Sequence, residues 1–265
     1  MQDIKLIVSD LDGTIIPESQ IISKEIIKAF KEAQNNGYQI LIATGRHYAF
    51  IDKDLINSLN PDYMVTINGG AVVNKDGAVL NSTPIPEDIF NKLIAACIEN
   101  DIALCFKFKE LMVTYNEHER FVKHYIRDDK YAHLIIDGTK NRDYHKLHGL
   151  PLGIFIIDDH NHVDQLNGLF PNLKIAYSFK YGYDIFPKNV TKKTAVDFVL
   201  KKLNLTWENV IAFGDAGNDL DMLTHAGIGV AMGNAKDEVK KQCAYVTKSV
   251  DDLGVKEALI HFNII

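Results

Sequence analysis

The chain has 265 residues, of which 46% are hydrophobic and 24% charged, and its formal net charge is −6 with a pI near 5.9. This length and apolar content suffice to bury one large core or two smaller ones. The excess of acidic residues gives the chain none of the net positive charge that binds nucleic acid, so a nucleic-acid-binding protein is disfavoured. No apolar run approaches the ~18 residues of a membrane span, and MQDIKLIVSD lacks the basic and long apolar regions of a signal peptide. We expect a soluble, cytoplasmic protein with no nucleic-acid or membrane partner, and the sequence leaves its oligomeric state open.

Cys97, Cys105 and Cys243 are odd in number and form no CxxC pair. Such cysteines are typical of buried thiols in a reducing compartment, so no disulfide scaffold is expected.

Short apolar runs alternate with helical patterns in the first third of the chain. IKLIVS, residues 4–9, predicts a buried strand, and the apolar spacing over 23–37 predicts a helix that ends at Gly37. The pattern continues with a strand over 38–44, a helical stretch to about residue 57 and a strand over 63–68. The Asp76-Gly77 pair within 71–80 then predicts a hairpin with a two-residue turn.

The middle of the chain has a different order of predicted elements, with strands that come in adjacent pairs. Its predicted helices are 86–99, 117–127 and 160–169, and its predicted strands are 102–107, 110–115, 152–157, 172–179 and 182–186. These elements indicate an α+β sheet of its own. A second domain inserted into the first is therefore expected.

Predicted strands and helices alternate again near the C-terminus. A helix over 191–203 precedes a strand over 209–215, and further strands are expected at 227–232 and 244–247, with a last helix to about residue 261. Apolar strands that alternate with helices favour a parallel sheet covered on both faces. The predicted fold is a doubly wound, Rossmann-like α/β core (1–82 and 187–265) with an inserted α+β domain (83–186).

Acidic side chains follow two of the predicted parallel strands. Asp10 and Asp12 come after the first strand, and Asp215 comes after NVIAFG; Thr44 and Gly45 follow the second strand. Open α/β sheets bind ligands at the carboxyl ends of their strands. Carboxylates gathered there favour a hard dication, and Mg²⁺ held by carboxylates, water and substrate phosphate fits best.

A fixed positive charge is available near the same edge. Thr191 is a candidate N-cap, which puts Lys192 and Lys193 in the first helical turn, where a lysine is unfavourable unless an anion lies nearby. A phosphate would be such an anion. In GDAGNDLDM, Asn218 and Asp219 lie one turn beyond Asp215 and face the same crevice.

With these motifs, the sequence resembles the haloacid dehalogenase superfamily, and more closely its Cof-type phosphatases with a large type IIB cap. The resemblance covers the whole chain. It rests on DLDGT (10–14), IATGR (42–46), VTKK (190–193) and GDAGNDLDM (214–222), and INGG (67–70) and VAMGNA (230–235) also look like segments of this family. It implies a phosphatase core with an α+β cap that selects the substrate.

The resemblance also implies roles for individual residues. Asp10 would be the nucleophile that forms an aspartyl-phosphate, and Asp12 the general acid and base. Asp10, the carbonyl of Asp12 and Asp215 would bind Mg²⁺, with Asp219 in support. Groups implied to contact the substrate are Thr44, Lys192, Asn218 and the backbone N–H groups around Leu11 and Gly45. Arg46, next in the second motif, is a further candidate for a substrate contact. The family usually has glycine after the third-motif lysine, where this chain has Lys193; the preceding Val190-Thr191 favours Lys192 as the catalytic lysine.

Simpler interpretations exist for each residue. Asp10 and Asp12 could form a turn, Thr44 could be a strand-end hydroxyl, Lys192 a solvated helix residue, and Arg46 a partner of an acidic group in the core.

Three functions remain open from the sequence. They are a Mg²⁺-dependent phosphatase of small phosphorylated metabolites, a sugar phosphomutase or phosphotransferase, and a non-enzymatic phosphometabolite-binding regulator. The intact Asp10 and Asp12 pair argues against the regulator.

Overall fold

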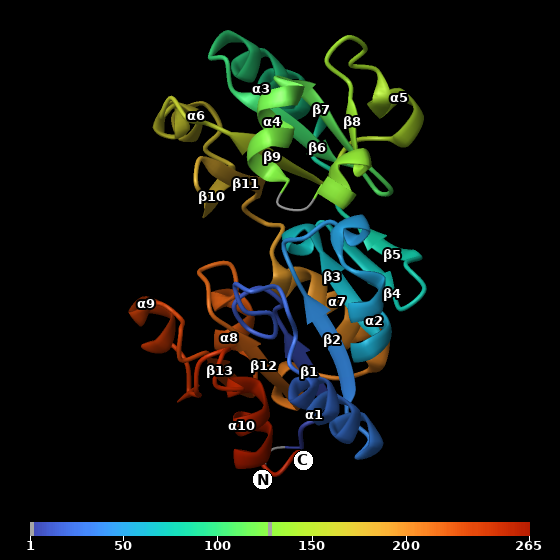
Figure 1. Ribbon diagram of the computed structural model, residues 1–265, viewed down its shortest axis with the longest axis vertical. Helices are drawn as coiled ribbons and strands as arrows, with labels where there is room; N and C mark the ends of the chain where they lie inside the picture. The colour runs from blue at the N-terminus through green and yellow to red at the C-terminus, as the bar shows by residue number, and fades with distance from the viewer. Residues whose placement is uncertain (1–2, 127–128) are drawn as a thin grey trace. The chain divides into compact units, whose positions relative to one another are not determined.

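A computed structural model describes residues 3–126 and 129–265 (Figure 1). The chain divides into two compact units. The first contains the residues up to Thr44, Ile51–Asn81 and Thr191–Ile265, and the second contains Gly45–Phe50 and Ser82–Val190. The first two residues of the expected core and the last residue of the expected helix 117–127 lie outside the described residues. No helix in the described part of the chain is long and apolar enough to cross a membrane.

The first unit is built on an eight-stranded sheet in the order β14-β13-β12-β1-β2-β3-β4-β5. Its strands are β1 (Leu6–Ser9), β2 (Gln39–Ala43), β3 (Tyr63–Thr66), β4 (Ala71–Asn74), β5 (Val79–Ser82), β12 (Val210–Gly214), β13 (Ile228–Ala231) and β14 (Tyr245–Val246). The six strands from β14 to β3 are parallel, and β4 runs antiparallel to β3. The prediction of a doubly wound parallel α/β sheet is thereby confirmed.

Helices cover both faces of this sheet because its strands are apolar on both sides. They are α1 (Lys24–Asn35), α2 (Lys53–Leu59), α7 (Lys192–Leu203), α8 (Leu220–His225), α9 (Asp237–Lys240) and α10 (Gly254–His261). Leu6 and Val8 pack into one cluster with residues of α7 and α8, whereas the alternate residue Ile7, also fully buried, points to the opposite face. Helix α1 contacts α2 and α10, and Figure 1 shows these three on the same side of the strands.

The helical stretch expected after the second strand is present in two pieces, a short 3₁₀ turn (Tyr48–Phe50) that belongs to the second unit and α2, which begins anew because the side chain of Asp52 accepts from the Asp54 N–H. One local prediction in the first unit was wrong. The expected two-residue turn is longer, since β4 ends at Asn74 and β5 begins at Val79. The Asn74 side chain accepts from two backbone N–H groups, those of Asp76 and Ala78, and so stabilises a wider loop.

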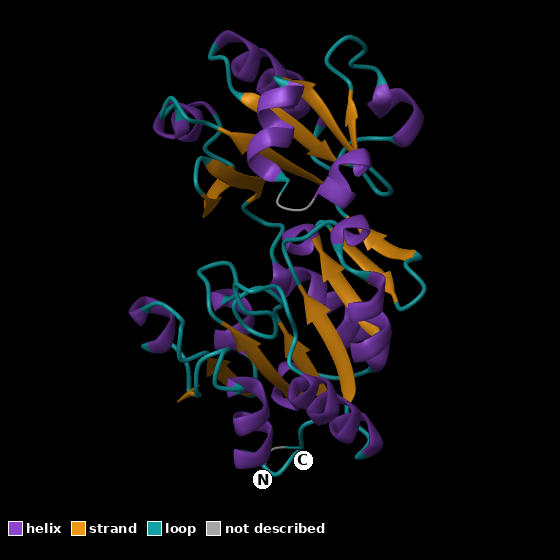
Figure 2. Cartoon of the chain, in the orientation of Figure 1, coloured by secondary structure: helices purple, strands orange, loops and turns teal. Residues whose placement is uncertain are grey.

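The second unit is a six-stranded sheet in the order β10-β11-β9-β6-β7-β8, with helices against both faces (Figure 2). Its strands are β6 (Ala103–Lys107), β7 (Met112–Asn116), β8 (Ile135–Asp137), β9 (Gly153–Ile157), β10 (Leu173–Phe179) and β11 (Gly182–Pro187), and its helices are α3 (Glu87–Glu99), α4 (His118–Tyr125), α5 (Tyr144–His148) and α6 (Val163–Leu169). Neighbouring strands are antiparallel except β7 and β8. Strand β8 and helix α5 were not predicted, and α6 begins three residues later than expected.

Candidate active site

Three strand ends bring candidate residues to one edge of the first unit. Strand β1 lies between β2 and β12 and is parallel to both, so the residues that follow these strands are neighbours. Asp10 follows β1, Thr44 follows β2, and Asp215 follows β12. The backbone N–H of Asp10 donates to the carbonyl of Phe213 at 3.0 Å, which fixes the start of the loop that carries both first-motif aspartates.

Lys192 lies between two of the carboxylates. Its Nζ is 2.6 Å from Oδ1 of Asp10 and 2.6 Å from Oδ1 of Asp219, and all three side chains are buried. Thr191 caps α7 in a reciprocal capping box with Thr194, which places Lys192 at the first helical position. Burial disfavours the charged form of this lysine, but the two carboxylates outweigh that effect and raise its pKa above the ordinary value.

The fourth-motif loop folds around Asp219. Its Oδ2 accepts from the N–H groups of Asp215 and Ala216, at 3.1 and 3.0 Å. Gly214 permits this close approach, because a Cβ there would lie 2.6 Å from the Cβ of Asp219. One aspartate therefore orders the loop with one oxygen and binds Lys192 with the other.

Asp215 is held from the first-motif loop. The hydroxyl of Thr14 donates to its Oδ1 at 3.1 Å. Gly13 has φ +80°, and a Cβ at that position would lie 2.4 Å from Oδ2 of Asp215. The glycine and threonine of DLDGT are therefore needed to seat an aspartate that is about 200 residues away in the sequence.

The three carboxylates form a candidate cation site. Asp10, Asp215 and Asp219 each offer an oxygen within 4.8 Å of the others. Burial raises the pKa of Asp10 well above its usual range; Lys192 opposes this, while the neighbouring carboxylates add to it. Burial, reinforced by Asp219, raises the pKa of Asp215 to about 6. Carboxylates outnumber Lys192 here, and a hard dication with oxygen ligands suits this donor set.

Sequence reasoning assigned no role to Asn68, although it quoted INGG as a motif. The Nδ2 of Asn218 donates to the Oδ1 of Asn68 at 2.9 Å, and the backbone N–H of Asn68 donates to the carbonyl of Thr44. Ile67 and Asn68 both have positive φ, and for a β-branched isoleucine this is a strained conformation. Asn68 thus links the turn after β3 to Asn218 of the fourth motif.

Replacing Asn68 separates its backbone role from its side-chain role. Asn68→Gly keeps the left-handed conformation and removes the amide, so we expect a melting temperature close to that of the wild type with a raised KM. Asn68→Ala should also lower the melting temperature, because alanine is disfavoured at φ 54°. Thermal unfolding and steady-state kinetics of both variants test this, and an unchanged KM in Asn68→Gly would contradict it.

The remaining candidates are placed as follows. Asp12 is exposed, while Leu11 is buried and its carbonyl accepts from the N–H groups of Ile15 and Ile16. Gly45 and Arg46 follow Thr44 directly but belong to the second unit. Lys193 forms an ion pair with Asp197, one turn along α7, at 2.9 Å.

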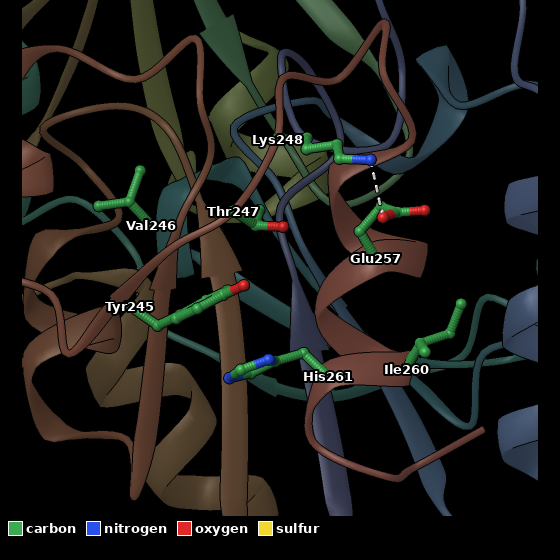
Figure 3. Close-up of a pocket in the computed structure, with 7 residues that line it drawn as sticks. All are labelled: Tyr245, Val246, Thr247, Lys248, Glu257, Ile260 and His261. Carbon is green, nitrogen blue, oxygen red and sulfur yellow. Dashed lines mark ion pairs between the residues drawn. The ribbon is translucent and has the colours of Figure 1, made fainter.

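A surface pocket lies between β14 and α10 (Figure 3). Its lining consists of Tyr245, Val246, Thr247, Lys248, Glu257, Ile260 and His261. Lys248 is paired with Glu257 at 2.8 Å, and the ring of Tyr245 stacks on that of His261. Because its lysine is already neutralised, this pocket is a poor anion site, and none of its lining residues belongs to the acidic cluster.

The fold and the site define an α/β enzyme with a lysine–carboxylate centre at the carboxyl ends of a parallel sheet. A family model described as haloacid dehalogenase-like hydrolase matches residues 7–259. The chain belongs to this family. That result confirms the superfamily resemblance drawn from the sequence motifs.

Similar proteins have phosphatase names. A putative phosphatase of Bacillus subtilis, YkrA, is 28% identical over 97% of both chains. The 5-amino-6-(5-phospho-D-ribitylamino)uracil phosphatase YcsE of the same organism is 30% identical over 98% of this chain and 96% of its own. The phosphatase BT1666 from Bacteroides thetaiotaomicron has a similar structure, with a TM-score of 0.86 and 26% identity over 100% of this chain and 97% of its own. The sugar phosphatase BT4131 of HAD subclass IIB has a TM-score of 0.86 and 27% identity over 98% of this chain and 100% of its own. The prediction of a HAD-type phosphatase is confirmed at the level of family and enzyme class.

Proposed function

We propose that this protein is a Mg²⁺-dependent phosphatase of small phosphorylated metabolites, sugar phosphates or similar phosphomonoesters, that acts through an aspartyl-phosphate on Asp10. The observation that carries the proposal is the placement of Asp10 beside Lys192 and the carboxylates of Asp215 and Asp219. A nucleophilic carboxylate, a fixed cation and a set of cation ligands are the parts that phosphoryl transfer requires. The sugar phosphatase and the other relatives named above support this substrate class.

In the first step, a carboxylate oxygen of Asp10 attacks phosphorus, and the bond between phosphorus and the leaving oxygen breaks. Lys192 engages Oδ1 of Asp10, so we assign the attack to Oδ2. Asp12 is exposed, so it can reach the leaving group and donate the proton that the departing oxygen requires. Asp10 then carries the phosphoryl group as an acyl phosphate, a mixed anhydride, and Asp12 is deprotonated.

In the second step, water attacks the phosphorus of the aspartyl-phosphate. Asp12 takes the proton from this water, phosphate leaves, and the Asp10 carboxylate is regenerated. Thr44, Asn218, Lys192 and the N–H groups of Leu11 and Gly45 would hold the phosphoryl oxygens through both steps. Asp10, the carbonyl of Asp12, Asp215 and Asp219 would hold Mg²⁺, which supplies positive charge against the phosphoryl oxygens when bound.

We further propose that residues 83–186 form the cap that selects the leaving group, and that 1–82 with 187–265 form the catalytic core. The named substrates of YcsE and of the sugar phosphatase BT4131 differ, which supports this division of labour, since a common core can serve different substrates through a variable second domain.

Phosphate release from a panel of phosphomonoesters tests the proposed function. We expect release from sugar phosphates in the presence of Mg²⁺ and a drop to the level of the uncatalysed reaction when a chelator removes the metal. Added Mg²⁺ should restore the rate. Release that survives complete chelation would contradict the metal assignment, and an isomerised sugar phosphate without free phosphate would indicate a mutase.

A further inference from the structure

The second unit contains a buried lysine that the mechanism above does not use. Lys107, the last residue of β6, is 1% exposed, and its Nζ lies 2.6 Å from Oδ1 of Asp184 on β11. Strand β9 separates β6 from β11, so the lysine reaches across it and lies over the ring of Phe155, 5.3 Å from its centroid. An ion pair in this position has a large desolvation cost, and apolar residues of similar volume often serve stability as well.

The same ammonium group makes a contact that an apolar residue could not make. Its Nζ donates to the backbone carbonyl of Gly45 at 3.3 Å. Phe108, the residue after β6, makes a second contact with this segment: its carbonyl oxygen lies 2.7 Å from Nε2 of His47. Lys107 and the residue that follows β6, Phe108, therefore hold the two residues that flank Arg46.

His47 is suited to be a permanent anchor. It is 1% exposed, and burial lowers its pKa to about 4, so the ring is neutral under ordinary conditions. Since Nδ1 accepts from the N–H of Ala49 at 3.1 Å, Nε2 carries the proton and donates to Phe108. Phe50 completes the attachment by packing into the apolar cluster of the sheet face that also carries Cys105 and Phe155.

We propose that Lys107 is a positioning residue: with Asp184 it fixes the Gly45–His47 backbone and thereby the conformation from which Arg46 would bind the phosphorylated substrate. Lys107 is too buried to contact substrate itself and acts through the segment it holds. The inference rests on the proposed function, in which the N–H of Gly45 contacts the phosphoryl group, and adds to it the substrate contact that the sequence suggested for Arg46.

In the principal test variant the anchor is removed without leaving a buried charge unpaired. Lys107→Met alone would leave the Asp184 carboxylate without its partner, so the principal variant combines Lys107→Met with Asp184→Leu. Asp184→Asn keeps the lysine but removes the carboxylate that pairs with its buried charge, so its effect should be intermediate. Cys97→Ala, a buried change on α3 in the other apolar cluster of the second unit, is the control for general loosening of the sheet.

Hydrogen exchange of peptides that cover residues 45–50 measures the anchor without any substrate. We expect the double variant to increase exchange there by about tenfold or more, with a smaller increase for Asp184→Asn and almost none for Cys97→Ala. The Phe50 N–H, which donates to the His47 carbonyl, is a suitable reporter. Unchanged exchange in the folded double variant would overturn the proposal whatever the activity.

A double-mutant cycle with Arg46→Ala measures the functional consequence. We expect the Lys107→Met, Asp184→Leu variant to lower kcat/KM by about tenfold to a hundredfold, mostly through KM, and to add little when Arg46 is already alanine. Effects that multiply, or faster exchange with unchanged kcat/KM, would overturn the positioning role. If the wild type released no phosphate from any substrate, the proposed function would fail, whereas the exchange measurement would still decide whether Lys107 anchors the segment.

Discussion

Replacing Asp10 by asparagine is expected to lower kcat by about 10⁴-fold or more while leaving the fold intact. The amide cannot form the acyl phosphate, so no interaction elsewhere in the site compensates for its loss. Asparagine also has nearly the same shape and removes one of the crowded buried carboxylates, which is why stability should be retained. Steady-state phosphate release and thermal unfolding measure the two effects.

Asp197→Asn is the matched control, because Asp197 is also an aspartate in the first unit but pairs with Lys193 and Trp207 away from the acidic cluster. We expect its kcat to stay within about twofold of the wild type. Substantial residual turnover in pure Asp10→Asn protein would refute the assignment of Asp10 as the nucleophile.

The second large effect concerns the two adjacent lysines. Lys192→Ala removes the cation between Asp10 and Asp219, so we expect kcat to fall by about 10³-fold. Loss of one member of a buried ion pair also typically costs about 3–5 kcal/mol of unfolding free energy, because the remaining charges are left without a partner. Kinetics and denaturant unfolding on the same preparations separate the catalytic loss from the structural one.

Lys193→Ala is the internal control, since it changes the neighbouring residue of the same helix. Its partly exposed pair with Asp197 belongs to a class of contact worth about 0.3–0.5 kcal/mol, and kcat should be nearly unchanged. A larger catalytic effect at Lys193 than at Lys192 would show that the third motif has been assigned in the wrong register.

The core of the fold was predictable because local patterns agree with it. Apolar runs such as residues 4–9 and 38–44 alternate with amphipathic helices, and this rhythm specifies a parallel sheet. Parallel strands end at one edge, so residues such as Asp10 and Asp215 could be expected to meet there. The placement of Lys192 in the first turn of α7 likewise follows from a local signal, the capping residue Thr191.

Other features could not be read from the chain because they depend on tertiary contacts. Asn68 adopts a left-handed conformation and accepts a hydrogen bond from Asn218, a residue 150 positions away in the sequence. Lys107 and Asp184 are on strands separated by a third; alone, Lys107 has the pattern of a strand-end polar residue and Asp184 that of a polar residue within a strand. The longer loop between β4 and β5 reflects the Asn74 side chain, a local signal that was overlooked beside Asp76-Gly77.

The measurement that tests the account most directly is a burst experiment on Asp12→Asn with p-nitrophenyl phosphate. Nitrophenolate needs no proton to leave, so the first transfer should proceed while water attack, which needs Asp12 as base, becomes slow. We predict a burst of nitrophenolate stoichiometric with enzyme, and a phosphate adduct on the peptide that contains Asp10. Nitrophenolate and free phosphate released in step without a burst, or an adduct on another residue, would contradict covalent catalysis by Asp10.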